Sequence, residues 1–148
     1  MNDYTYNNIE SSNKKGDHRP VRSLPENIKA RRRQIKVIAR ETLTHRLFHN
    51  PVFKRAIRIT GSSIDEWLNQ PHKHYVEKNE LLLNLGEVLG KSTYLGDSTY
   101  KRRLAHIFET TLCGEATWIV VTDVPGRGAT IYSISDSPNI LNGITKPV

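Results

Sequence analysis

The residues best suited to chemistry begin with His74 and Lys78, which lie four positions apart in one segment. Apolar residues recur at helical spacing through this segment and predict a helix from about His72 to Leu89, which ends at Gly90. On such a helix His74 and Lys78 share the apolar face, whereas His72 points away. A histidine beside a lysine can act as a general acid or base next to a cation that stabilises negative charge. The alternative is structural, with the histidine bonded to a backbone carbonyl and the lysine reaching solvent.

His106 is the second candidate acid or base. It falls in a strand predicted from Leu104 to Leu112, on the face that carries large apolar side chains, so it is either a core residue or a site residue. Lys101, Arg102 and Arg103 lead into this strand and form either a solvated turn or a grip on a phosphate.

Two hydroxyl groups complete the candidate set. Ser133 and Ser135 share one face of the last predicted strand, which runs from Thr130 to Ser135. Hydroxyls on a terminal strand are either ordinary edge residues or donors that hold a phosphate oxygen.

Several other kinds of active site are excluded by their missing motifs. The glycine-rich run Pro125–Gly128 lies between predicted strands rather than before a helix, so it is a hairpin turn and not a phosphate loop. Cys113 precedes a turn glycine without a nearby base in the sequence, and as a single cysteine it excludes an internal disulfide. His72 and His74 stand two apart and cannot ligate one metal from one helix. We therefore expect no metal and no cofactor.

Positive charge is concentrated in the N-terminal part of the chain. The formal net charge is +7, but residues 1–60 hold 14 Lys and Arg against 5 Asp and Glu, whereas residues 61–148 hold 8 against 10. A uniformly basic nucleic-acid-binding domain is thereby excluded. The basic residues that could bind a nucleic acid or a protein partner stand on one predicted helix and are Arg31, Arg32, Arg33 and Lys36.

The order of predicted elements indicates an α+β fold. Residues 1–22 contain almost no aliphatic side chains and predict a disordered arm, and residues 23–50 form a basic helical segment whose helix spans about Glu26 to Phe48. Residues 51–148 form the α+β domain. Its elements are a short strand in Val52–Thr60, a helix at Ile64–Leu68 capped by Ser62 or Ser63, the His72–Leu89 helix, and strands at Tyr94–Leu95, Leu104–Leu112, Ala116–Val124 and Thr130–Ser135 separated by turns at Gly96–Asp97, Cys113–Glu115 and Pro125–Gly128.

Length and hydropathy bound the class of protein. A chain of 148 residues suits one domain. Its longest apolar stretch, Trp118–Val121, is far below the roughly 20 residues of a membrane span, and the N-terminus lacks the plan of a signal peptide. We expect a soluble, cytoplasmic protein.

Four segments, taken in order, resemble a known family. They are ITGSSIDEW at 59–67, PHKHYVEKNE at 71–80, AHIFE at 105–109 and YSISDS at 132–137. Together they resemble the barnase/EndoU/colicin/RelE-like nucleases of phages and mobile elements, and most closely their large polyvalent-protein-associated branch. The resemblance covers about residues 52–145.

The resemblance implies N-terminal helices packed on a four-stranded antiparallel sheet, and RNA cleavage without metal. In that reaction a base activates a ribose 2′-hydroxyl, and the adjacent phosphate becomes a 2′,3′-cyclic phosphate. Carried over to this chain, His74 and His106 are the acid and base, Lys78 stabilises charge, and Ser133 or Ser135 holds a phosphate oxygen. Such a domain standing alone is a cytoplasmic toxin, a delivered effector or an inactive copy.

Two other functions stay open from the sequence. The chain could be a non-catalytic nucleic-acid-binding accessory protein of a phage or mobile element, which uses the helix around Arg31–Arg33. The same basic helix could dock an acidic partner, and for a toxin that partner is an inhibitor or antitoxin protein.

Overall fold

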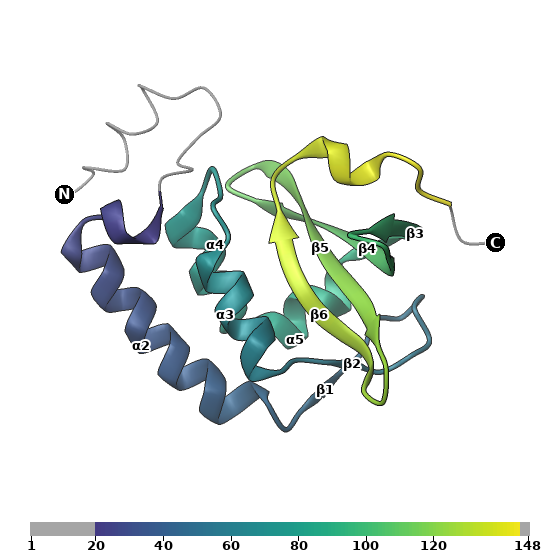
Figure 1. Cartoon of the computed structure of the whole chain (residues 1–148), viewed down its shortest axis with the longest axis horizontal. Helices are drawn as coiled ribbons and strands as arrows, with labels where there is room; N and C mark the ends of the chain where they lie inside the picture. The colour runs from purple at the N-terminus through teal and green to yellow at the C-terminus, as the bar shows by residue number, and fades with distance from the viewer. Residues whose placement is uncertain (1–19, 146–148) are drawn as a thin grey trace.

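Helices occupy the first half of the chain and strands dominate the second half (Figure 1). The computed structural model describes residues 20–145. The helical elements are η1 (Val21–Ser23), α2 (Glu26–Leu43), α3 (Gly61–Asn69), α4 (Tyr75–Leu82), α5 (Leu85–Lys91) and η2 (Pro138–Leu141). The strands are β1 (Leu47–Phe48), β2 (Ile57–Arg58), β3 (Thr93–Tyr100), β4 (Arg103–Leu112), β5 (Glu115–Val124) and β6 (Gly128–Ser135). The predicted α+β class is confirmed.

The sheet has six strands in the order β1-β2-β6-β5-β4-β3. The predicted meander β3–β6 is antiparallel throughout, but β2 pairs with β6 in parallel, through Arg58 and Thr130. The expectation of four antiparallel strands was therefore incomplete, because two short strands extend the sheet and make it mixed. This parallel pairing has a consequence for function: α3 begins three residues after Arg58, so its N-terminus lies against β6.

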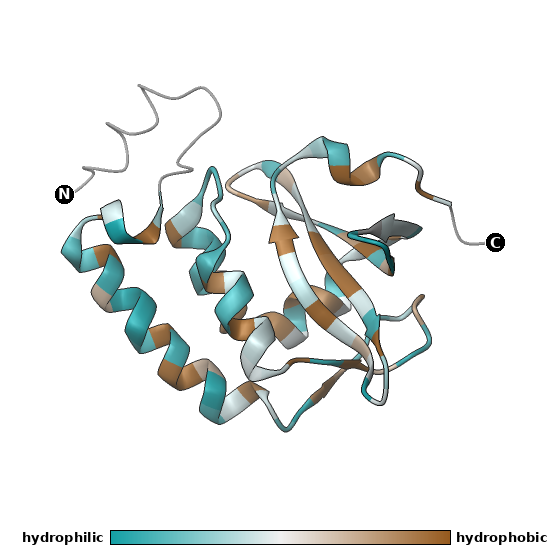
Figure 2. Cartoon of the chain, in the orientation of Figure 1, coloured by the Kyte–Doolittle hydropathy of each residue, from teal (hydrophilic) through white to brown (hydrophobic). Residues whose placement is uncertain are grey.

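The main core lies between the helices and one face of the sheet, where apolar residues line the facing surfaces (Figures 1 and 2). Its members include Ile35, Ala39 and Leu43 of α2, Ile64 and Trp67 of α3, Leu85 and Leu89 of α5, Phe108 of β4, Ile119 of β5 and Ile131 of β6. A smaller cluster on the opposite face of the sheet is covered by the C-terminal segment that contains η2. The basic helix α2 thus shares one core with the rest of the chain.

Two elements are shorter than expected. The first helix ends at Leu43 rather than near Phe48, and Leu47–Phe48 form strand β1 instead. The strand predicted at Val52–Thr60 is confined to Ile57–Arg58. Between them the buried Asn50 side chain accepts from the amides of Val52 and Phe53, which fixes a turn where the apolar pattern suggested a strand.

The predicted helix from His72 to Leu89 is divided into α4 and α5. Its start is delayed because the buried His72 ring accepts the His74 amide at 2.8 Å, which holds the preceding loop out of helical conformation. Its middle breaks near Asn84, followed by Gly86, and both residue types are weak helix formers. His72 therefore does not point away on a helix, as predicted, but is 1% exposed in a loop.

The turn between β3 and β4 lies later than predicted. Gly96 and Asp97 are within β3, where a register shift between Tyr94 and Gly96 marks a bulge that Gly96 accommodates with φ near 129°. The chain reverses at Lys101 and Arg102, which both adopt positive φ. Of the predicted arm at residues 1–22, residues 1–19 lie outside the described part of the structure.

Candidate functional site

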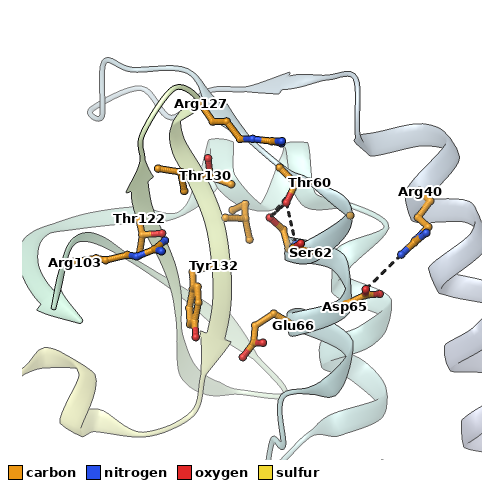
Figure 3. Close-up of a pocket in the computed structure, with 14 residues that line it drawn as sticks. Arg40, Thr60, Ser62, Asp65, Glu66, Arg103, Thr122, Arg127, Thr130 and Tyr132 are labelled. Carbon is orange, nitrogen blue, oxygen red and sulfur yellow. Dashed lines mark hydrogen bonds and ion pairs between the residues drawn. The ribbon is translucent and has the colours of Figure 1, made fainter. Parts of the chain in front are cut away.

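A groove of about 690 Å³ opens between the start of α3 and the strands β5 and β6 (Figure 3). It is lined by Arg40 of α2, residues 60–63, Asp65 and Glu66 of α3 and its cap, Arg103 of β4, Thr122 and Val124 of β5, and Arg127, Thr130, Ile131 and Tyr132 of the β5–β6 hairpin. Five elements, α2, α3, β4, β5 and β6, thus contribute to the groove, and the parallel pairing of β2 with β6 brings α3 to the strands.

Two arginines in the groove carry unneutralised charge. Arg103 and Arg127 are exposed, and neither guanidinium is paired with an acid among residues 20–145. Arg40, in contrast, lies 3.4 Å from the Asp65 carboxylate. Guanidinium groups match phosphate oxygens in geometry and charge, so two such arginines are chemically suited to a phosphate-containing ligand.

The N-terminus of α3 adds hydrogen-bond donors to the same wall. Thr60 caps the helix in a reciprocal box: its hydroxyl accepts the Ser63 amide at 3.1 Å, and the Ser63 hydroxyl accepts the Thr60 amide at 3.1 Å. The amides of Gly61 and Ser62, in the first turn, have no intrahelical acceptor by the geometry of a helix. In Figure 3 the Arg127 side chain points toward Thr60, so its cation and this helix terminus face one part of the groove.

Glu66 and Tyr132 face each other at the other end of the groove (Figure 3). The Glu66 carboxylate makes no ion pair within the described part of the chain. The Tyr132 hydroxyl accepts a hydrogen bond from Lys101 Nζ at 3.0 Å. Because an ammonium can only donate, the Tyr132 hydroxyl is the acceptor in this contact and keeps its own O–H group. The pair therefore offers one proton acceptor and one proton donor beside the arginines.

His74 lies outside the groove, where the N-terminus of α4 contacts the first residue of β5. It is the N-cap residue of α4, and its Nε2 is 2.8 Å from Glu115 Oε1. Lys73 Nζ bonds the other Glu115 oxygen at 2.9 Å. Hydrogen bonds from Lys73 and His74 lower the pKa of Glu115, which stays a carboxylate and orients the imidazole.

His106 is 2% exposed between two carboxylates. Its Nδ1 lies 2.7 Å from Asp97 Oδ1 and its Nε2 lies 3.0 Å from Asp123 Oδ1. Burial alone raises the pKa of Asp123, but hydrogen bonds from Arg55 and His106 outweigh it and hold that pKa below its ordinary value. The buried ring also packs on Phe53, with centroids 4.8 Å apart. This arrangement ties three strands and a loop together.

The two histidines do not converge on one phosphate. His74 bonds Glu115 at the first residue of β5, whereas His106 bonds Asp123 eight residues later on the same strand. At about 3.3 Å per residue the two contacts are roughly 26 Å apart. The expected pairing of His74 with His106 in one acid–base site is therefore wrong.

Lys78 is also placed away from any ligand. It is fully buried, and its ammonium donates to the carbonyl of Trp67 and lies 4.3 Å from the centre of the Tyr75 ring. Burial, with Arg32 nearby, lowers the pKa of Lys78 well below its ordinary value. Lys78 joins α4 to α3, and it cannot stabilise charge on a substrate from this position.

The remaining predicted residues fall into separate places. The buried Ser133 hydroxyl lies 3.4 Å from the Gln70 side chain, and the Ser135 hydroxyl accepts the Ser137 amide at 3.1 Å. Lys101 and Arg102 form the β3–β4 turn, and of the predicted basic cluster Arg103 alone lines the groove. The structure therefore brings one predicted residue, Arg103, to the groove.

The basic residues of α2 are largely engaged within the molecule. Arg31 bonds Glu80 with distances of 2.6 and 2.8 Å, and Arg33 bonds Glu26 at 2.8 Å. Lys36 lies 3.1 Å from Asp65. Arg32 bonds the Asn69 side chain. These contacts reduce the charge that this helix offers to a partner.

Glu66, Arg127 and Tyr132 are the groove residues that the sequence did not reveal as functional. Glu66 stands three residues after Ser63, one of the two serines predicted to cap this helix, but that pattern concerns helix initiation, and the structure places the cap at Thr60. Arg127 is flanked by two turn glycines, an exposed position from which a cation can reach a ligand. No local pattern connects Glu66 with Arg127, because the two residues line one groove only through the pairing of β2 with β6.

Comparison with known families decides the relationship. The model for the large polyvalent protein-associated domain 3 family matches residues 26–124. The chain belongs to this family. Membership in the large polyvalent protein-associated domain 3 family confirms the predicted polyvalent-protein-associated branch. The match includes Glu66 and Arg103 and ends before Arg127 and Tyr132. Comparison with curated proteins and with solved structures gives no match.

Among residues 20–145, no helix has the length and apolar character required to cross a bilayer.

Proposed function

We propose that the groove binds single-stranded RNA and cleaves it without a metal ion, by attack of a ribose 2′-hydroxyl on the adjacent phosphate. The observation that carries this proposal is the presence of two unpaired arginines, Arg103 and Arg127, in one groove with an unpaired carboxylate, Glu66. Cations bind the phosphate, and a carboxylate beside them is suited to accept a proton.

Each groove residue has a role in the proposed reaction. Arg127, together with the first amides of α3, binds the non-bridging phosphate oxygens, and Arg103 stabilises the charge that grows on them. Glu66 accepts the 2′-hydroxyl proton as the bond from that oxygen to phosphorus forms. Tyr132 donates a proton to the 5′-oxygen as its bond to phosphorus breaks. The products are a 2′,3′-cyclic phosphate and a 5′-hydroxyl.

The family context supports the same class of function. Membership in a polyvalent-protein-associated family fits a factor carried by a phage or mobile element, and the four resembling segments suggest relationship to the barnase/EndoU-like nucleases. We infer toxin-like use against RNA in the cytoplasm. An acidic inhibitor that covers Arg103 and Arg127 is the expected protein partner.

RNA cleavage in the presence of a chelator tests the proposal. Purified protein should shorten a single-stranded RNA and leave 2′,3′-cyclic phosphate ends. DNA of the same sequence should bind but stay intact, because it lacks the attacking hydroxyl. Intact RNA under conditions where the groove binds it would instead favour a non-catalytic nucleic-acid-binding protein.

Binding assays locate the interface. Each phosphate contact on a single strand contributes about −0.7 to the slope of log affinity against log salt. Replacing both Arg103 and Arg127 with alanine should therefore reduce that slope by about 1.4. Arg33→Ala, which removes an exposed arginine of α2, is the matched control and should leave the slope unchanged. The opposite pattern would place the interface on the basic helix.

A further inference from the structure

Three side chains with metal-binding atoms meet beside the N-terminus of α4. They are the imidazole of His74, the carboxylate of Glu77 and the thiol of Cys113, and their ligand atoms all lie within 4.8 Å of one another. His74 and Glu77 belong to the cap and first turn of α4, whereas Cys113 belongs to the turn between β4 and β5. We propose that this cluster is a binding site for a divalent transition-metal ion, for which Zn²⁺ is the expected occupant.

Glu77 supplies the first independent support. Its Oε1 atom is buried, and no donor among residues 20–145 forms a hydrogen bond with it. A buried carboxylate oxygen without a donor is costly, because it has lost its hydration without compensation. A metal ion bound between Glu77, His74 and Cys113 would satisfy this oxygen. The atom is thus explained by a cation that the cluster holds.

The contacts of His74 supply the second support. Its Nε2 is bonded to Glu115, which leaves Nδ1 as the nitrogen that can ligate a metal. Glu115 is in turn held by Lys73. Metal-binding histidines commonly donate their second ring nitrogen to a carboxylate, which orients the ring and raises its basicity. Glu115 has this positioning role for His74.

The donor set favours zinc over a hard cation. Sulfur and nitrogen ligands select Zn²⁺ and related transition metals, whereas Mg²⁺ and Ca²⁺ prefer oxygen alone. Tetrahedral zinc bonds of about 2.0–2.3 Å place ligand atoms roughly 3.3–3.6 Å apart. The present spacing requires side-chain shifts on the order of 1 Å, and Cys113 is exposed in the β4–β5 turn.

The proposed metal site and the RNA groove are separate. Glu115 stands at the first residue of β5, and the groove residue Thr122 stands seven residues later, roughly 23 Å along the strand. Loss of the metal site therefore leaves the arginines and Glu66 of the groove in place. The two proposals can fail independently of each other.

Cobalt binding to the full chain, purified without a histidine tag, tests the site. Co²⁺ should bind at one equivalent and produce a thiolate-to-metal charge-transfer band in the near ultraviolet. Cys113→Ser should abolish this band, because the sequence holds one cysteine. In competition with a chromophoric chelator, Cys113→Ser and Glu77→Gln should each weaken Zn²⁺ binding by at least the 10–100-fold typical of supporting residues.

Matched variants separate this site from other metal binding. Glu87→Gln and His45→Gln alter an exposed carboxylate and an exposed imidazole outside the cluster and should leave Zn²⁺ affinity unchanged. Glu115→Gln should weaken it by about 10–100-fold without removing the cobalt–thiolate band. Circular dichroism in chelator should show that the exposed Cys113→Ser change leaves the fold intact. A missing charge-transfer band at saturating Co²⁺, or equal Zn²⁺ affinity of Cys113→Ser and the natural chain, would overturn the proposal.

Discussion

At the scale of single residues, the partner of a polar side chain decides its role more than its type does. His74 and Lys78 stand four residues apart in the sequence, but their partners differ. His74 bonds Glu115, whereas Lys78 bonds the Trp67 carbonyl. The sequence could show that both stand among apolar residues. It could not supply their partners. Glu115 belongs to a strand distant in the sequence, and Trp67 belongs to the preceding helix, which a loop separates from Lys78.

The buried ammonium of Lys78 makes a testable contribution to stability. Burial lowers the pKa of Lys78 in the folded state well below 10.5, the ordinary value for lysine. Between these two pKa values the unfolded chain binds more protons than the folded chain, so this residue makes the free energy of unfolding rise with pH. We predict that Lys78→Met removes this dependence, and that the stability of the variant relative to the natural chain declines as the pH rises toward 10.5.

Urea unfolding at a series of pH values measures the effect. Lys54→Met, which removes an exposed lysine, controls for the loss of one positive charge. A stability difference between Lys78→Met and the natural chain that does not change with pH would contradict a lowered pKa of the buried Lys78.

At the scale of elements, local signals located the start of α2 and two hairpin turns, but not the break between α4 and α5, the β3–β4 turn or the edge of the sheet. The start of α2 at Glu26 and the hairpin turns at Cys113–Gly114 and Gly126 follow from local residue preferences. Strand β2 has two residues, too few for a periodic pattern, and its parallel partner β6 lies 70 residues away. The groove depends on this pairing, so its residues could not be assembled from local patterns.

Thr60 links the stability of α3 to the proposed function. Its hydroxyl accepts the Ser63 amide, and loss of such a cap costs about 0.5–2 kcal/mol. We predict that Thr60→Ala lowers the free energy of unfolding by this amount and also weakens RNA binding, because the first turn of α3 lines the groove. Thr42→Ala is the control, since the Thr42 hydroxyl bonds a carbonyl of its own helix and lies outside the groove. Equal stability of Thr60→Ala and the natural chain in urea would exclude this role for the cap.

At the scale of the whole molecule, net charge alone gives a misleading picture of the interface. The excess of Lys and Arg in residues 1–60 suggested that α2 is the nucleic-acid-binding surface. In the fold, Arg31, Arg33 and Lys36 are paired with acids, whereas Arg103 and Arg127 of the less basic second part are not. Because Arg31, Arg33 and Lys36 have acidic partners and the two groove arginines have none within residues 20–145, we favour the groove over α2 as the interface.

The most direct test of the groove as an RNA-cleaving site is the single-turnover cleavage rate of Glu66→Gln. This change keeps the size of the side chain and removes the proton acceptor. We predict that Glu66→Gln binds RNA normally but cleaves it about 10²–10⁴-fold more slowly, the usual contribution of a general base. Glu87→Gln makes the same change at an exposed carboxylate outside the groove. This control variant should cleave RNA at the natural rate. Equal cleavage rates for Glu66→Gln and Glu87→Gln would contradict the assignment of the reaction to this groove.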